Sequence, residues 1–413
     1  MDENSPPESI DQSKEKKKSR RPANTAFRQQ RLKAWQPILT PKTVIPLFFV
    51  IGLITAPIGG LLLYASSTVK EIRIDYTNCF KDAPTDTQAK MGSDLVFPSF
   101  QNDNNVTALW QRFEGINQTY NGNPYVVENL TQCRLQFNIP EDMSAPVLMY
   151  YRLENFYQNH RRYVASYYDE QLLGNDVSLA QVDSSECDPL ASLNGKAIYP
   201  CGLIANSLFN DTISSPRALG TTDESTYQMN STGIAWSSDK ALYGERKSTD
   251  YSGIVPPPDW QKQFPNGSYT ADNPPPNLKE NEHFIVWMRT AGLPTFSKLY
   301  ARNNNDKLVA GNYEINITDT FRTDVYQGKK SIVLTTLSVM GGKNQFLGIL
   351  WLVVGGFCLA LALVFLATNL VKPRKLGDHT YLSWNNAPPS TAAKGKGKAS
   401  GPSTGMTTGR DMS

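Results

Sequence analysis

The stretch Thr43–Val69, TVIPLFFVIGLITAPIGGLLLYASSTV, contains no charged residue. A second uncharged stretch, Asn344–Val371, NQFLGILWLVVGGFCLALALVFLATNLV, lies near the other end of the chain. With a rise of about 1.5 Å per residue, a helix of either length can cross a hydrocarbon core roughly 30 Å thick. The sequence therefore predicts two transmembrane helices, 43–69 and 344–371, with residues 70–343 forming one large domain between them.

The charges are distributed unevenly along the 413 residues, although the formal net charge is +3. Residues 1–42 contain ten basic and five acidic residues, and residues 372–413 contain seven and two. Residues 70–343 contain 24 basic and 31 acidic residues. The positive-inside rule therefore places both termini in the cytosol and the intervening domain in the lumen or outside the cell. Because the basic character follows topology, we expect no nucleic-acid partner.

The first apolar stretch is expected to be a retained signal anchor. It begins about 40 residues into the chain, behind a polybasic segment, and it is longer than the apolar region of a signal peptide. The alternative, a cleaved signal, would leave a single C-terminal helix with an outside N-terminus.

N-x-Ser/Thr sequons and cysteines both gather in the domain between the two stretches. The seven sequons begin at Asn105, Asn117, Asn129, Asn210, Asn230, Asn266 and Asn316. Four of the five cysteines, Cys79, Cys133, Cys187 and Cys201, lie there too, and Cys358 lies in the second apolar stretch. Both patterns predict a glycosylated, disulfide-bonded domain in an oxidising compartment. Four cysteines allow three pairings, of which the sequential one is the simplest.

We expect no catalytic residue, metal site or cofactor. The sequence has no CxxC or HxxxH spacing, and its large domain contains two histidines, His160 and His283. It also lacks a phosphate-binding loop, a nucleophile elbow, an HExxH motif and the phosphorylation motif of an ion or lipid pump. A surface or packed role explains His160, beside Arg161 and Arg162, better than acid–base chemistry does. The chain is therefore not expected to be an enzyme.

Short alternating, β-branched and aromatic runs predict the fold of residues 70–343. The clearest are EIRIDY (71–76), APVLMYYRL (145–153), NYEINIT (312–318) and SIVLTTLSV (331–339). Their spacing favours a mainly antiparallel β-sandwich. Helical excursions are expected at 154–172, where Tyr157, Val164 and Tyr168 share a helical face, and at 280–293. Residues 204–280, rich in Asn, Ser, Pro and Gly, are expected to form long ordered loops.

The segments outside the large domain have distinct compositions. Residues 1–23 and most of 372–413 cannot bury enough apolar surface to fold and are predicted to be disordered cytosolic tails. Residues 24–42 place Phe27 and Trp35 among basic residues and predict an interfacial helix. This helix is either a membrane anchor or a docking element for another protein.

Small residues recur at four-residue spacing in both apolar stretches: Gly52, Ala56 and Gly60 in the first, Gly356 and Ala360 in the second. Such faces allow helices to approach closely. They serve either contact between the two stretches or contact with a foreign helix. Neither stretch contains an Asp, Glu, His, Lys or Arg residue, so an ion or proton path through them is not expected.

Seven phrases follow one another along the chain: NTAFRQQRLKAWQPILTP, PIGGLLLY, ENFYQNHRRYV, PCGLIANSLFND, GIAWSSDK, WMRTAGLPTFSKLY and MGGKNQFLGI. Together they closely resemble the cell division control protein 50 family, also called the ligand-effect modulator family, over roughly residues 24–371. Their wording is similar to that of fungal members. Val339, where an aromatic residue is expected, is a local departure from the family pattern.

The resemblance implies a non-catalytic accessory β-subunit of a type IV P-type ATPase, a flippase that moves phospholipids to the cytosolic leaflet. Such subunits associate with the catalytic ATPase, allow it to leave the endoplasmic reticulum and support its transport cycle. The resemblance also implies the bonds Cys79–Cys133 and Cys187–Cys201, and it marks Asn210 as a characteristic glycosylation site. The expected partners are the ATPase and membrane lipids. Contact with the ATPase is expected near Phe27, Trp35, Gly52, Ala56 and Gly60 and near the PCGLIANSLFND segment. The expected membranes are the endoplasmic reticulum, the Golgi or endosome, and the plasma membrane.

Two other classes share part of this pattern. A trimeric ligand-gated channel subunit also has two spans and inside termini, but it needs polar pore-lining positions that LGILWLVVGGFCLALALVF lacks. A lumenal glycosyltransferase normally has one span and a DxD metal motif, which is absent here.

Overall fold

A computed structural model describes residues 24–33, 39–101, 106–120, 122–220, 225–339 and 341–373. The chain divides into two compact units. One contains the residues up to Ile54 and those from Gly355 onward, and the other contains Thr55–Val354. Residues 1–23 and 374–413, in which most of the predicted tails fall, lie outside the described part, as do Trp35 and Asn105.

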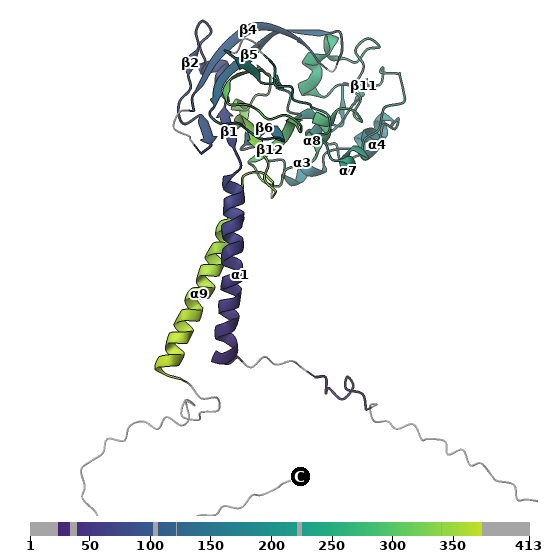
Figure 1. Cartoon of the computed structure of the whole chain (residues 1–413). Coiled ribbons are helices and arrows are strands. Elements are labelled where there is room, and N and C mark those ends of the chain that lie inside the picture. The colour runs from purple at the N-terminus through teal and green to yellow at the C-terminus, as the bar shows by residue number, and fades with distance from the viewer. Residues whose placement is uncertain are drawn as a thin grey trace, which may run out of the picture. The chain divides into compact units, whose positions relative to one another are not determined.

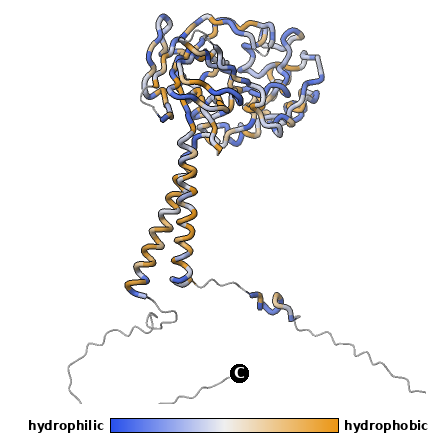
Figure 2. The backbone as a smooth tube through the Cα atoms, viewed as in Figure 1, coloured by the Kyte–Doolittle hydropathy of each residue, from blue (hydrophilic) through white to orange (hydrophobic). Residues whose placement is uncertain are grey.

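Two long helices, α1 (Pro41–Ser67) and α9 (Phe346–Val371), are apolar and long enough to cross a membrane (Figures 1 and 2). Helix α1 begins two residues before the predicted stretch because proline suits the first helical position, where its missing N–H is not needed. Helix α9 begins two residues late. The Asn344 side-chain oxygen there accepts a hydrogen bond of 3.0 Å from the Phe346 N–H. The prediction of two membrane helices is confirmed.

The domain between these helices is built on two antiparallel sheets (Figure 1). The first has the order β12 (Phe296–Asn303), β6 (Val147–Glu154), β14 (Lys329–Thr336), β1 (Glu71–Asp75) and β3 (Val96–Ser99). The second has the order β10 (Arg217–Leu219), β13 (Gly311–Asp319), β5 (Val126–Ile139), β4 (Ala108–Thr119) and β2 (Ala89–Lys90), and β9 (Thr212–Ile213) also pairs with β13. A small third sheet contains β11 (Ile254–Val255), β8 (Lys196–Ile198) and β7 (Ser192–Leu193). This architecture confirms the predicted antiparallel β domain with helical excursions.

All four predicted strands are confirmed, as β1, β6, β13 and β14, but the long pair β4 and β5 was missed. Near Trp110 and Leu135 these strands alternate buried and partly buried positions, whereas no position is buried toward their distal ends. Gly115, with φ +72°, lies in a bulge where the pairing register shifts. The bulge and the exposed ends remove the period of two on which a sequence-based prediction depends.

The predicted helix at 280–293 is confirmed as α8 (Glu282–Met288), which is capped by the Asn281 side chain. The helix predicted at 154–172 is wrong, because this segment forms two short turns, α3 (Arg161–Ala165) and α4 (Asp169–Leu172). The buried Ser166 hydroxyl interrupts it by accepting a hydrogen bond of 2.9 Å from the Leu203 N–H. Tertiary hydrogen bonding therefore overrides local helix propensity here.

Shorter helices complete the domain: α2 (Cys79–Asp82), α5 (Leu179–Asp183), α6 (Leu203–Asn206), α7 (Ser237–Lys240), η2 (Pro258–Gln263), η3 (Pro265–Gly267) and η4 (Asp324–Tyr326). The described part of 204–280 has short elements separated by ordered loops, as predicted.

The core lies between the two large sheets. Strand β1 contributes Ile72 and Ile74, and the second sheet contributes Leu135 and Ile315, all at most 1% exposed. Burial of each such side chain stabilises the fold by about 1.5–3 kcal/mol. Since side chains alternate along a strand, burial of Ile72 and Ile74 directs Glu71 and Arg73 to the outer face of the first sheet.

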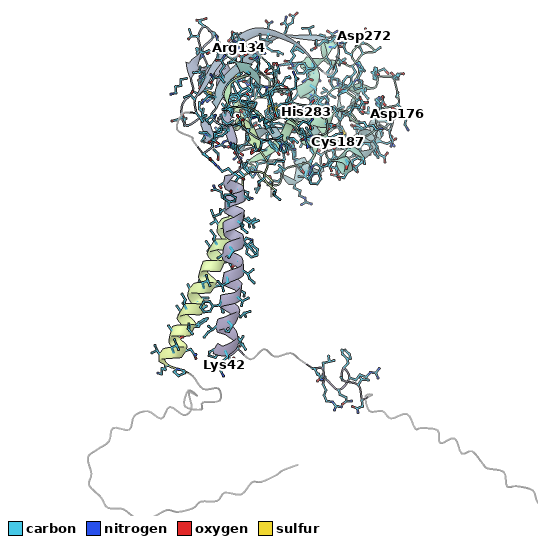
Figure 3. The ribbon with its side chains drawn as sticks, in the orientation of Figure 1. Lys42, Arg134, Asp176, Cys187, Asp272 and His283 are labelled. Atoms are coloured by element: carbon cyan, nitrogen blue, oxygen red, sulfur yellow. A yellow bond between two sulfur atoms is a disulfide. The ribbon has the colours of Figure 1, made fainter. Side chains whose placement is uncertain are left out.

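Two disulfide bonds are present among the described residues. Cys79–Cys133 joins the start of α2, just after β1, to strand β5, and so links the two sheets. Cys187–Cys201 closes a shorter loop, and Cys187 is labelled in Figure 3. This is the sequential pairing. Cys358, in α9, is a free cysteine.

The predicted interfacial helix is not present in the described residues 24–33. This segment makes a single hydrogen-bonded turn, and Gln30, with φ +52°, ends it. A helix this short is marginal without tertiary contacts. Phe27 is 77% exposed, so it retains an apolar surface available for contact.

Candidate interaction surface

The described residues contain no group of three or more His, Cys, Asp or Glu side chains that could hold a metal ion. The features that bear on function are three adjoining surface hollows, a buried charge network and the packing faces of the membrane helices.

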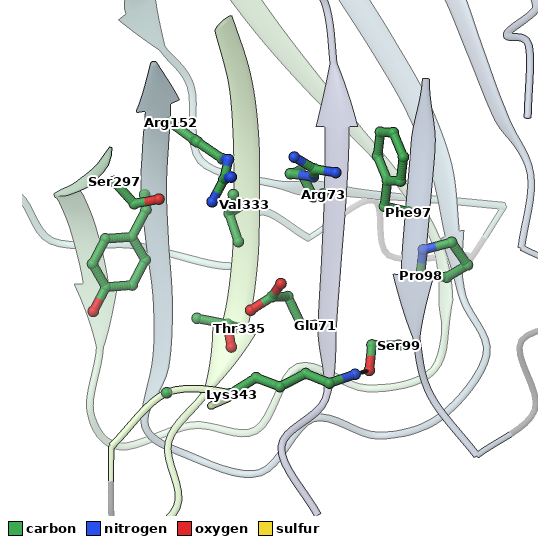
Figure 4. Close-up of a pocket in the computed structure, with 12 residues that line it drawn as sticks. Glu71, Arg73, Phe97, Pro98, Ser99, Arg152, Ser297, Val333, Thr335 and Lys343 are labelled. Atoms are coloured by element: carbon green, nitrogen blue, oxygen red, sulfur yellow. Dashed lines mark hydrogen bonds between the residues drawn. The ribbon is translucent and has the colours of Figure 1, made fainter. Parts of the chain in front are cut away.

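The first hollow, called here the sheet hollow, lies on the outer face of the first sheet and has a volume of about 570 Å³ (Figure 4). It lies close to both membrane helices along the chain, because β1 begins four residues after Ser67 and Lys343 precedes α9 by three. The Lys343 ammonium donates a hydrogen bond to the Ser99 hydroxyl across the hollow. The hollow therefore opens beside the point where the chain passes between domain and membrane.

Two arginines that line the sheet hollow, Arg73 and Arg152, share a carboxylate outside its lining, and Glu71 is the carboxylate within the lining. Glu154 accepts hydrogen bonds of 3.1 Å from both Arg73 and Arg152. The Arg73 guanidinium also lies 3.9 Å from the centre of the Phe97 ring. These contacts fix two planar guanidinium groups in place, an arrangement suited to carbonyl and carboxylate groups of another surface.

The second hollow, called the Trp236 hollow, has a volume of about 330 Å³ and adjoins the first, since Tyr150 and Ser297 line both. The Trp236 side chain is 65% exposed, and the Arg289 guanidinium lies 4.1 Å from its ring. The buried Lys298 ammonium donates to three backbone carbonyls at the end of α8. Lys298 thus fixes the end of α8, which presents Arg289.

The third hollow, called the Leu242 hollow, has a volume of about 610 Å³ and shares Asp239 and Arg289 with the second. Its wall includes Leu242, which is 62% exposed, and Val164, which is 40% exposed. The three hollows form one continuous region, called here the hollowed face. Exposed Trp and Arg side chains are typical of protein–protein contacts. Trp236 and Arg289 were not predicted as candidate residues, although they lie in the phrases GIAWSSDK and WMRTAGLPTFSKLY.

A buried charge network connects both sheets beneath this surface. The Lys330 ammonium, 1% exposed, donates to Asp211 at 2.8 Å, to Asp319 at 2.6 Å and to the Phe321 carbonyl at 2.6 Å. The Tyr76 hydroxyl donates to the same Asp211 carboxylate at 2.9 Å. The second oxygen of the Asp319 carboxylate is buried without a hydrogen-bond partner.

This network should bind a proton in the mildly acidic range. Burial and the neighbouring Asp211 carboxylate raise the pKa of Asp319 to about 6. With every group ionised, one lysine faces two carboxylates, so protonation of one carboxylate neutralises the cluster. Because the pKa of Asp319 is higher in the folded than in the unfolded state, protonation stabilises the fold. This stabilisation is complete below the unfolded-state pKa near 4 and is lost as the pH rises through about 6.

We therefore expect Asp319→Asn to remove part of the pH dependence of stability. The thermal midpoint of the wild-type full-length protein should rise relative to that of the variant as the pH falls from about 7.5 to about 5. His283 acts in the opposite direction, because burial lowers its pKa to about 4, but its contribution cancels in the comparison. If the difference between the wild-type and variant thermal midpoints stayed constant across this pH range, Asp319 would not titrate there.

The network also explains the phrase PCGLIANSLFND (200–211). Its side chains are mostly buried, and the Asp211 carboxylate accepts hydrogen bonds from the Thr320 and Phe321 N–H groups at 2.7 and 2.6 Å. The segment therefore packs in the domain core, where Asp211 bonds it to the backbone that follows β13. The neighbouring Asn210 is half-buried, as is Asn316, whereas Asn117, Asn129, Asn230 and Asn266 are exposed.

The small residues of the membrane helices divide into two sets. Buried positions repeat every seven residues, at Ile45, Gly52, Gly59 and Ser66 in α1 and at Gly348, Gly355 and Ala362 in α9, and Thr55 and Cys358 are buried between them. A Cβ atom at Gly52 would lie 2.6 Å from Leu359 Cγ, and one at Gly59 would lie 2.7 Å from the Leu352 nitrogen. In contrast, Gly60 and Gly356 have no atom within 4 Å of that position, Ala360 is exposed and Ala56 is intermediate. Gly52 therefore packs the two helices together, while Gly60 faces away.

The sequence comparisons agree with this architecture. The model of the "LEM3 (ligand-effect modulator 3) family / CDC50 family" matches residues 62–375. The chain belongs to this family. The family match starts near the end of α1 and ends just beyond α9, so it covers the whole domain and α9 but only the last turns of α1.

Family members from several organisms are similar over most of their length. The phospholipid-transporting ATPase accessory subunit CDC50 of Chaetomium thermophilum is 44% identical over 379 residues, which cover 88% of this chain and 91% of that protein. The phospholipid-transporting ATPase accessory subunit CRF1 of Saccharomyces cerevisiae is 42% identical, with 90% of each chain covered. Cell cycle control protein 50A of Bos taurus is 40% identical, with 85% of this chain and 90% of that protein covered.

Proposed function

We propose that this chain is the non-catalytic accessory subunit of a phospholipid-transporting ATPase, assembled with a type IV P-type catalytic subunit. The observation that carries the proposal is its similarity to accessory subunits of such ATPases over about nine-tenths of both chains. The two membrane helices and the disulfide-bonded domain supply the surfaces that such an assembly needs.

The accessory subunit acts by binding its partner differently in different conformational states. A subunit that binds one state better shifts the population toward that state, so it can support a transport cycle without touching the lipid. The hollowed face and the outward small residues are the surfaces proposed for this contact, together with Phe27 and Trp35. Assembly through these surfaces is also what allows the ATPase to leave the endoplasmic reticulum.

Both termini are proposed to be cytosolic, with the domain glycosylated in the lumen or outside the cell. The basic flanks of the helices and the confinement of the sequons to residues 70–343 support this orientation. The endoplasmic reticulum, the Golgi or endosome, and the plasma membrane are the proposed locations. Among the sequons, Asn117, Asn129, Asn230 and Asn266 have exposed side chains suited to modification.

Affinity purification of the full-length chain in mild detergent, followed by mass spectrometry, tests the assembly. We expect a stoichiometric polypeptide above about 100 kDa that contains an Asp-Lys-Thr-Gly-Thr motif. Recovery of self-associated copies alone would contradict the proposal and would favour the alternative of a trimeric ligand-gated channel-like subunit. The comparisons give that alternative no support.

The division of small residues predicts opposite effects for two substitutions. Gly60→Leu should lower recovery of the catalytic subunit without changing the abundance of this chain, because Gly60 faces away from α9. Gly52→Leu should lower the abundance of the chain itself, because Leu359 and Gly355 occupy the space. Quantitative co-purification measures both effects, and Gly60→Ala provides a conservative control. Full recovery of the catalytic subunit with Gly60→Leu would exclude this face from the contact.

A further inference from the structure

Within the unit that contains residues up to Ile54 and from Gly355, the two helices touch and then separate. They pack at Gly52, where Leu359 and Gly355 lie, and then through the edge-to-face pair Phe48–Phe365, whose ring centres are 5.8 Å apart. Toward Pro41 and Val371 the helix ends move apart (Figure 1). The space between them is a groove of about 790 Å³.

The lining of this groove is apolar at depth and polar at the mouth. Val44, Ile45 and Phe365 line the apolar part. Thr40 and Lys372 line the mouth. Lys372 is exposed and makes no ion pair within the part of the chain that the structure describes.

Further basic residues flank these two helix ends in the sequence. Lys42 lies at this end of α1 (Figure 3), and the sequence continues after Lys372 with Arg374 and Lys375. No acidic residue lies between Glu15 and the apolar part of α1, or between the apolar part of α9 and Asp378. The groove therefore combines apolar walls with an excess of positive charge at one end.

We propose that this groove binds one anionic phospholipid of the cytosolic leaflet, with an acyl chain along the apolar walls and the headgroup at the basic mouth. The choice of leaflet rests on the proposed orientation. The volume of the groove falls within the range of small-molecule sites and suits part of a lipid rather than the whole molecule. Basic pockets between membrane helices on the cytosolic side are a recognised form of lipid site, and each basic residue near that surface contributes about 1 kcal/mol to anionic-lipid attraction.

The shape and charge of the groove favour a lipid over a foreign helix. A helix is about 10–12 Å across and would need to lie along the groove past its closed end at Phe48 and Phe365. An anionic lipid is a narrow chain with its charge at one end, which matches both features.

Photocrosslinking of the full-length chain in nanodiscs tests the proposal. The probes are diazirine-labelled phosphatidylserine and phosphatidylcholine at equal mole fraction, with the labelled peptides identified by mass spectrometry. We expect phosphatidylserine to label residues 39–45 and 364–372 at least about fivefold more than phosphatidylcholine, the equivalent of about 1 kcal/mol. Thr368→Trp should abolish this labelling, and Lys372→Gln should reduce the headgroup preference without abolishing labelling.

Two matched controls separate the groove from the general lipid surface. Leu363→Trp adds the same side chain at an exposed position of α9 that does not line the groove, and Lys33→Gln removes a charge outside it. Both should label like the wild type. Equal labelling by the two lipids would overturn the proposal.

The same experiment with the co-purified catalytic subunit distinguishes a failure of the lipid site from a failure of the proposed function. Loss of lipid labelling, together with a protein crosslink at residues 364–372, would show that a partner helix occupies the groove and would also overturn the proposal. Selective phosphatidylserine labelling in preparations that contain no ATPase would support the lipid site even if the proposed function failed.

Discussion

Lys330→Met should lower the free energy of unfolding by about 3–5 kcal/mol, the typical effect of removing one partner from a buried ion pair. The substitution fills similar space but leaves the Asp211 and Asp319 carboxylates buried without their counter-ion. For a domain of this size we expect the thermal midpoint of the full-length protein in detergent to fall by about 6–20 °C. Intrinsic tryptophan fluorescence can measure this change.

The neighbouring Lys329 provides a matched control, because it is the adjacent residue of β14 but is exposed. Lys329→Met should change the midpoint by little, as surface charges usually do. Adding Asp319→Asn to Lys330→Met should recover part of the loss, since one unpaired charge is then removed. Equal midpoints for the Lys329 and Lys330 variants would show that the network contributes little to stability.

The sequence predicted the membrane helices and the strands at the centre of the sheets because those segments carry their signal locally. A long uncharged run or an alternating run such as EIRIDY needs no tertiary information. The segment 154–172 failed because its fate depends on Ser166, whose buried hydroxyl bonds to residues 21 and 37 positions away in the chain. Such contacts are invisible to a helical periodicity count.

The candidate surfaces were harder to predict than the fold. Four-residue spacing selected Gly52, Ala56 and Gly60 as one face. The face that packs against α9 repeats every seven residues, and it contains Gly52 and Gly59 but not Gly60. A seven-residue repeat is the signature of two helices packed at a shallow angle, and it was present in the sequence. Trp236 and Arg289, by contrast, lie 53 residues apart and meet through the fold. No local pattern would have brought them together.

Removal of the Cys79–Cys133 bond should be the other strongly destabilising change. The bond spans 54 positions of sequence, and both cysteines are fully buried. In the chain-entropy model, a cross-link over this length stabilises the folded state by about 4 kcal/mol, against about 3 kcal/mol for the shorter Cys187–Cys201 loop. We therefore expect Cys79→Ala with Cys133→Ala to lower the thermal midpoint by about 8–16 °C.

The position of this bond gives its loss a structural consequence beyond the chain-entropy effect. It ties the segment after β1, in the first sheet, to β5, in the second, so its removal weakens the connection across the core. Cys358→Ser, at the free thiol in α9, tests whether loss of a cysteine alone affects the measurement, and it should leave unfolding of the domain unchanged. If the double variant unfolded within about 1 °C of the wild type, packing between the sheets rather than the cross-link would hold them together. A larger loss on removing the Cys187–Cys201 bond would contradict the dependence on loop length.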